Sequence, residues 1–191
     1  EKQVRGICVG APGITFYDEG VVKWAPSLNW RHFPLKKSLE DRFNVPVSLE
    51  NDVNLAAQGE MWFGAGQNAR NLVLIIVGQG IGAGIIIDGT VYRGSHLTAG
   101  EIGFLLPDKT SLEKRWEGVG AAEYAAAIPG ILARAKTELK ASVCTVKAGD
   151  LTLEAVVDAY ESGADWAKSA IDDTLDSLAQ ITAAVSVCYD P

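Results

Sequence analysis

Apolar runs and amphipathic stretches alternate along the chain and predict its elements. Continuous apolar runs next to Gly, Pro or Asn predict strands, and apolar residues that recur every three to four positions predict helices. The predicted strands are 4–9, 21–24, 46–49, 72–77, 85–87 and 90–93. The predicted helices are 34–43, 53–63, 118–138 with an interruption at Pro129-Gly130, 151–162 and 164–187.

Three further segments, 26–30, 64–71 and 94–106, are rich in turn residues and predict loops. The order of strands, then a hairpin group, then helices indicates an α/β fold. We expect two lobes, a first α/β lobe over residues 1–67 and a second lobe over residues 68–191. The chain starts abruptly on an apolar run and stops after a long helix at Pro191, so we expect a fragment of a longer protein.

A glycine-rich segment follows the apolar run at 72–77 and is the most distinctive pattern in the chain. Gly78, Gly80, Gly82 and Gly84 alternate with other residues, and Ile85 to Asp88-Gly89 follow them. Gly-rich loops can direct backbone N–H groups at a phosphate. A dinucleotide-binding fingerprint needs a helix after its glycines, whereas Asp88-Gly89 predicts a hairpin turn. A phosphate loop and an ordinary glycine-rich hairpin therefore both stay open.

Composition and charge narrow the function classes. The chain of 191 residues is 48% hydrophobic and 21% charged, which is typical of a packed globular protein. Its net charge is −7 and its Lys and Arg are scattered, so no nucleic-acid surface is predicted. No apolar run reaches the roughly 18–20 residues that span a membrane. The three cysteines are odd in number and far apart, which argues against a disulfide framework and a metal site and favours a reducing, cytoplasmic compartment. We expect His32 and His96 on solvated loops.

Three carboxylates lie where a ligand could meet them. Asp52 follows Asn51 at a predicted strand end, Glu101 stands between Gly100 and Ile102, and Glu123 begins a predicted helix. Carboxylates and an Asn amide suit the paired hydroxyls of a sugar, and one carboxylate could take a proton from an attacking hydroxyl. Each residue also has an ordinary interpretation. Asp52 could cap the following helix, Glu123 could favour its first turn, and Glu101 could lie on a solvated loop.

Taken together and in order, the motifs resemble the ROK family of bacterial sugar kinases and sugar-responsive repressors, over nearly the whole chain. The matching segments are 9–13, 49–54, 59–60 with 64–66, 80–89, 92–94 and 99–103. The resemblance implies an actin-like, ribonuclease-H-like two-lobe fold, present here in part. It also implies a small-molecule sugar ligand, a homodimer and a role in carbohydrate metabolism.

The resemblance assigns roles to individual residues. It implies that Gly13, Asn51, Asp52, Glu101 and Glu123 bind the sugar, and that Asp52 is the general base in family members that are kinases. It implies that the hairpin of Gly78, Gln79, Gly80 and Gly82 faces the phosphates of ATP, with Mg²⁺, if this protein is a kinase.

Departures from the family pattern shape the expected function. Phe104 stands where the family has a His that contacts the sugar and ligates zinc, the three zinc cysteines are replaced by residues 116–122, and Gln79 replaces a Thr. We therefore expect no zinc. We expect the sugar-sensing domain of a transcriptional regulator, with an ATP-dependent hexose kinase as the alternative. DNA would be contacted only through a domain outside this sequence.

Overall fold

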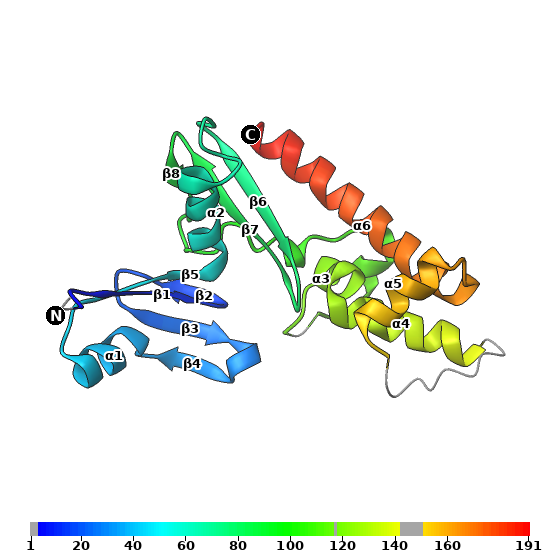
Figure 1. Cartoon of the computed structure of the whole chain (residues 1–191), viewed down its shortest axis with the longest axis horizontal. Coiled ribbons are helices and arrows are strands. Elements are labelled where there is room, and N and C mark those ends of the chain that lie inside the picture. Colours follow the sequence, from blue (N-terminus) through cyan, green and yellow to red (C-terminus); the bar gives the residue numbers. More distant parts are fainter. Residues whose placement is uncertain (1–3, 117, 142–150) are drawn as a thin grey trace. The chain divides into compact units, whose positions relative to one another are not determined.

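The fold is that of a computed structural model, which describes residues 4–116, 118–141 and 151–191 (Figure 1). The strands are β1 Ile7–Ala11, β2 Ile14–Phe16, β3 Val21–Ala25, β4 Trp30–Phe33, β5 Val47–Asn51, β6 Leu72–Val77, β7 Ile81–Ile87 and β8 Thr90–Val91. The α-helices are α1 Leu35–Phe43, α2 Asp52–Phe63, α3 Ala121–Ala126, α4 Ile128–Ala141, α5 Leu153–Glu161 and α6 Asp165–Tyr189. Short 3₁₀ helices are η1 Pro26–Leu28, η2 Ile102–Phe104 and η3 Lys109–Glu113.

The chain divides into two compact units. Unit 1 comprises residues 1–75 and 83–100 with Pro191, and unit 2 comprises residues 76–82 and 101–190. These units group residues by their contacts and interleave along the sequence, whereas the predicted lobes divide the chain once, between residues 67 and 68. The division into lobes stays a prediction. Each unit is described by itself below.

In unit 1, two small sheets share an apolar core. β1 and β5 pair in parallel, with Ile7 opposite Val47 and Ala11 opposite Asn51. β2, β3 and β4 form an antiparallel sheet in that order. The buried core residues between them are Ala11, Val22, Ala25 and Leu49. Because parallel strands run in the same direction, the pairing places the carboxyl end of β5 beside the loop that follows β1.

A second part of unit 1 packs α2 on the sheet of order β6-β7-β8 (Figure 1). The buried residues are Ala57 of α2, Ile86 of β7 and Val91 of β8. Gly84 makes this packing close, since a Cβ there would lie 2.5 Å from Cβ of Ala57. The expected hairpin turn at Asp88-Gly89 is confirmed: both residues have positive φ, 52° and 75°, as a type I′ turn requires.

Unit 2 contains a helical group. α4 and α5 pack on α6, and α3 packs on α4, α6 and η2 (Figure 1). Their buried apolar side chains lie at helical spacing, as the amphipathic pattern predicted, and include Ile131, Ala135, Leu139, Val156, Ala167 and Ala170. No helix in the described ranges is both long and apolar enough to cross a membrane.

Several sequence predictions of elements were wrong in detail. β1 begins at Ile7 rather than at residue 4. Ile7 to Gly10 are half-buried or exposed, only Ala11 of the strand is buried, and Val4 is 68% exposed. Among the described residues β1 pairs only with β5. His32 is exposed, as expected, but lies in β4, which pairs with β3. His96 is exposed in a turn, as expected.

The predicted helix at 118–138 is two helices, and the interruption lies at Ala127, ahead of the predicted Pro129-Gly130. Ala127 is extended, with ψ of 160°. Pro129 has no N–H and would clash within a continuous helix, and the break at Ala127 places it in the first turn of α4, where that N–H is not needed. Gly82 and Gly84 belong to β7 rather than to the turn, so the turn between β6 and β7 contains only Gly78, Gln79 and Gly80.

Candidate functional site

Asn51 is fixed at the carboxyl end of β5 by both ends of its amide. Its Oδ1 accepts hydrogen bonds from the backbone N–H groups of Val53 at 2.9 Å and Asn54 at 3.0 Å. Its Nδ2 donates to the carbonyl oxygen of Gly13 at 3.1 Å. Asn51 is therefore the N-cap of α2, and it ties the start of this helix to the loop after β1.

Gly13 can hold this loop only as glycine. Its φ is 79°, and a Cβ there would lie 2.2 Å from the carbonyl oxygen of Trp24. Larger residues are strained at positive φ and would also push the neighbouring β3 backbone away. The structure thus brings Gly13 and Asn51 together, 38 positions apart in the sequence.

Asp52 is the first residue of α2 and is exposed. The interpretation of Asp52 as the helix cap was wrong, because Asn51 occupies the cap position and supplies both bonds to the helix N–H groups. The Asp52 carboxylate accepts the N–H of Val53 at 2.9 Å and its remaining lone pairs can accept hydroxyl groups. We name Gly13, Asn51 and Asp52 the β5-end site.

A network that the sequence analysis missed lies under the β5-end site. Glu50 is 8% exposed. Its Oε1 accepts the backbone N–H of Asn51 at 2.9 Å and Nδ2 of Asn54 at 3.1 Å. Its Oε2 accepts Nε of Arg93 at 3.0 Å and Nη2 of Arg93 at 2.6 Å. The two partners lie 43 positions apart, so no local pattern could reveal the pair.

The glycine turn in unit 2 is the second place where predicted site residues gather. The N–H of Gly78 donates to the carbonyl oxygen of Gly80 at 2.9 Å, which closes the turn on itself, and Gln79 is exposed. Oε2 of Glu123 lies beside the turn, 3.1 Å from where a Cβ on Gly80 would stand. One backbone donor of the turn is therefore engaged within the protein, and a carboxylate lies next to the turn.

Glu123 lies against this turn from the third position of α3. A Cβ on Gly80 would lie 3.1 Å from Oε2 of Glu123, and a Cβ on Gly103 would lie 3.0 Å from the same atom. Burial raises the pKa of the Glu123 carboxyl, and the hydrogen bond from Ile81 opposes that rise. The carboxylate thus occupies a half-buried position between two glycines, where it can accept a hydroxyl group.

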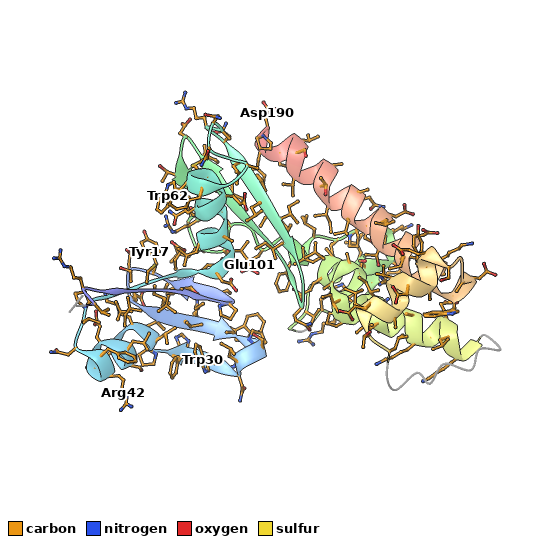
Figure 2. All side chains as sticks on the ribbon, in the orientation of Figure 1. Tyr17, Trp30, Arg42, Trp62, Glu101 and Asp190 are labelled. Atoms are coloured by element: carbon orange, nitrogen blue, oxygen red, sulfur yellow. The ribbon has the colours of Figure 1, made fainter. Side chains whose placement is uncertain are left out.

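Glu101 is half-buried and immediately precedes η2. The N–H of Phe104 donates to the carbonyl oxygen of Glu101 at 3.1 Å, which closes the first turn of η2. The solvated-loop interpretation of Glu101 therefore does not describe it fully. Phe104 is 46% exposed at the position of the family His. Glu101 is labelled in Figure 2. We name Glu101, Glu123 and residues 78–82 the glycine-turn site.

A cavity of about 190 Å³ opens beside Glu123 within unit 2. Its lining is mostly apolar and consists of Gln79, Val119, Glu123, Tyr124, Ala127, Pro129 and Gly130. Trp116 lies near this cavity's Tyr124, and the centres of the two rings are 5.7 Å apart. Nε1 of Trp116 donates to the carbonyl oxygen of Ser111 at 2.8 Å. Within the described residues, no cluster of His, Cys, Asp or Glu could hold a metal ion.

The sequence matches the ROK family over residues 1–191. A putative xylose repressor of Caldicellulosiruptor sp. is 39% identical over 143 residues, which are 75% of this chain and 36% of the repressor. A ROK family glucokinase from Streptomyces griseus, solved with glucose and AMPPNP, is 28% identical with a TM-score of 0.83, over 99% of this chain and 64% of the glucokinase. A ROK family transcriptional regulator, a homologue of the E. coli MLC protein, is 27% identical with a TM-score of 0.85, over 99% of this chain and 48% of that structure.

Similar curated relatives include glucokinases and xylose repressors alike, and the chain spans about a third of the length of the first of them. The expected fold is confirmed by these structures: the chain has part of the actin-like, ribonuclease-H-like α/β fold. By the match over its whole length, the chain belongs to the ROK family.

Proposed function

We propose that this chain is the sugar-sensing part of a ROK transcriptional regulator. One observation favours a sensor over a kinase. The turn that would hold phosphate already gives the N–H of Gly78 to the carbonyl oxygen of Gly80, and the carboxylate of Glu123 lies beside Gly80. When the carboxyl group of Glu123 is charged, it repels a phosphate at this turn. These residues therefore fit the phosphates of ATP poorly.

The same carboxylates suit a sugar. Asp52 and Glu123 offer acceptor oxygens to hydroxyl groups, and Asn51 is held rigidly by its bonds to Gly13 and to the start of α2. Groups that are fixed before binding lose less conformational entropy when the ligand arrives. We propose that Gly13, Asn51, Asp52, Glu101 and Glu123 all contribute to binding of a small-molecule sugar.

A hexose kinase is the second candidate, because the Asp52 carboxylate is exposed and could serve as a general base. In that case Gly78, Gln79, Gly80 and Gly82 would face ATP, whose Mg²⁺ would neutralise charge on the transferred phosphoryl group. The glucokinase of S. griseus was solved with glucose and AMPPNP. Homodimer formation, a cytoplasmic location and the absence of zinc remain parts of the proposal, as does DNA contact by a domain outside this sequence.

Two measurements on the whole protein test the proposal. Calorimetry with a panel that includes glucose, xylose and amino sugars is expected to detect binding, and Glu101→Ala is expected to weaken it. Unchanged binding in Glu101→Ala would remove the assignment of Glu101. Assays of ATP consumption with the same sugars are expected to show no sugar-dependent turnover. Turnover that Asp52→Asn lowers by about 10²–10⁴-fold would establish the kinase instead.

A further inference from the structure

The strongest side-chain network outside the predicted site residues joins Glu50 to Arg93. The guanidinium of Arg93 binds one carboxylate oxygen of Glu50 through two nitrogens, at 2.6 and 3.0 Å. The Glu50 and Arg93 side chains are 11% and 24% exposed. Such a paired fork is directional and fixes orientation as well as charge.

The carboxylate of Glu50 has partners at both of its oxygens. Oε2 accepts Arg93, while Oε1 accepts the backbone N–H of Asn51 and the side-chain amide of Asn54. Glu50 is thus the link between Arg93, which follows β8, and the peptide unit that carries Asn51 into α2. Any rotation of the Glu50 carboxylate moves the acceptor of the Asn51 N–H.

Arg93 is itself held on its other sides. Its guanidinium carbon lies 4.4 Å from the centre of the Tyr17 ring, within unit 1 (Tyr17 is labelled in Figure 2), and Nη1 donates to the carbonyl oxygen of Val91 at 3.3 Å. An Arg can stack on an aromatic ring and bind a carboxylate through two nitrogens at once, whereas Lys offers a single ammonium group.

We propose that Arg93 is a positioning residue for the β5-end site, acting through Glu50 on Asn51. This inference rests on the proposed sugar site, and it adds a positioning residue that lies 43 positions from Glu50 in the sequence. Without Arg93 the Glu50 carboxylate turns toward other partners or solvent, and the N–H of Asn51 loses a well-placed acceptor. Asn51 and the neighbouring Asp52 then present their polar atoms to the sugar less uniformly.

The test compares Arg93→Lys with Arg70→Lys in the whole protein. Arg70 also binds a carboxylate, that of Asp88 at 2.8 Å in unit 1, but both side chains are exposed, 80% and 66%. Two quantities are measured at a temperature where all variants are folded: hydrogen exchange of the Asn51 amide and the Kd for the tightest sugar of the panel. Arg93→Lys is expected to speed that exchange and to raise the Kd by about tenfold each, the effect of one lost charged hydrogen bond. Arg70→Lys is expected to leave both unchanged.

A purely structural role is distinguished by the double variant Glu50→Leu with Arg93→Met. Replacement of both partners of a buried ion pair by apolar residues often costs little stability. The unfolding midpoint of the double variant is therefore expected to lie near that of the wild type. Sugar affinity and Asn51 protection are expected to stay reduced, because the Oε1 acceptor is gone. Recovery of affinity together with stability would overturn the positioning role.

The two readouts also separate this inference from the proposed function. Wild-type exchange at Asn51 in Arg93→Lys overturns the inference whether or not a sugar binds. If no sugar binds the wild-type protein while Asn51 exchange accelerates in Arg93→Lys, the sugar function fails and the positioning of Asn51 by Arg93 stands.

Discussion

The β5-end site and the glycine-turn site hold their polar residues by different means. At the end of β5, Asn51 is fixed by side-chain hydrogen bonds to Gly13, Val53 and Asn54. Around Glu123 of the glycine-turn site, backbone lies directly against backbone: a Cβ on Gly120, which precedes α3, would lie 2.0 Å from the carbonyl oxygen of Gly103 in η2. The first arrangement is set by side-chain chemistry and the second by the absence of side chains.

Under the proposed function, this difference separates what a sensor needs from what a kinase needs. The hydrogen bonds of Asn51 would orient its amide toward a sugar in a sensor and in an enzyme alike. The close packing around Gly103 and Gly80 holds the Glu123 carboxylate beside the glycine turn. A sensor could keep a carboxylate there, whereas a kinase would need that turn for phosphate.

The largest expected effect is that of Gly120→Ala. Its Cβ would meet Gly103 O at 2.0 Å and Phe104 Cα at 2.7 Å, both of them backbone atoms. Because backbone cannot rotate away as a side chain can, we expect a loss of more than about 3 kcal/mol in the free energy of unfolding, measured by urea denaturation. Gly78→Ala is the matched control in the same unit, since a Cβ there meets nothing within 4 Å. Equal losses in the two variants would contradict the close-packing account.

An intermediate effect is expected for Asn51→Ala. Loss of the N-cap of α2 should lower the free energy of unfolding by about 1 kcal/mol. The hydroxyl of Thr152 caps α5 by accepting the N–H of Ala155 at 3.2 Å. Thr152→Ala removes that cap and should lower the free energy of unfolding by about the same amount. Calorimetry is then expected to show weaker sugar binding only for Asn51→Ala. Equal affinities in the two variants would reduce Asn51 to a helix cap.

The smallest effect is the pH dependence contributed by Glu123. Its folded-state pKa is raised by burial above the ordinary value of 4.5. Between the two values the folded protein binds more protons than the unfolded chain, so this group's contribution to stability falls as the pH rises. Glu123→Gln should therefore gain stability over the wild type as the pH rises above 4.5, and the gain should be small because the group is only half-buried.

Glu154 provides the comparison of opposite sign. Its pKa is lowered by hydrogen bonds at the start of α5, from its own backbone and from Thr152, so its contribution to stability is lost as the pH falls through the lowered folded-state value. Glu154→Gln should lose stability relative to the wild type as the pH rises. Urea denaturation at several pH values measures both, and a shift of the same sign in the two variants would contradict the burial of Glu123.

Local patterns were enough to predict much of the fold. The hairpin turn at Asp88-Gly89 and the existence of α5 and α6 follow from residue spacing alone. Their buried faces were predicted only in part: Ile181 and Val185 of α6 are buried, but Leu175 and Val157 are 51% and 39% exposed. β2 and β4 were missed, because three or four residues are too few to establish an alternating pattern. The break lies at Ala127, two residues before Pro129, since a proline is tolerated in the first turn of a new helix but not in a helix interior.

The candidate site shows the same limit in its chemistry. Spacing placed Asn51, Asp52 and Glu123 at element ends, as the structure has them, but it did not reveal which of Asn51 and Asp52 caps α2. The bond between Asn51 and Gly13, the pair of Glu50 with Arg93, and the contact of Glu123 with Gly80 join distant positions. Such contacts are set by the packing of the whole unit, to which no local pattern refers.

Sugar binding and ATP turnover measured on one preparation of the whole protein test the central claim most directly. The account predicts a calorimetric signal for at least one sugar, weakened in both Asn51→Ala and Glu101→Ala, and no sugar-dependent ATP consumption. Sugar-dependent ATP consumption that falls by about 10²–10⁴-fold in Asp52→Asn would contradict it.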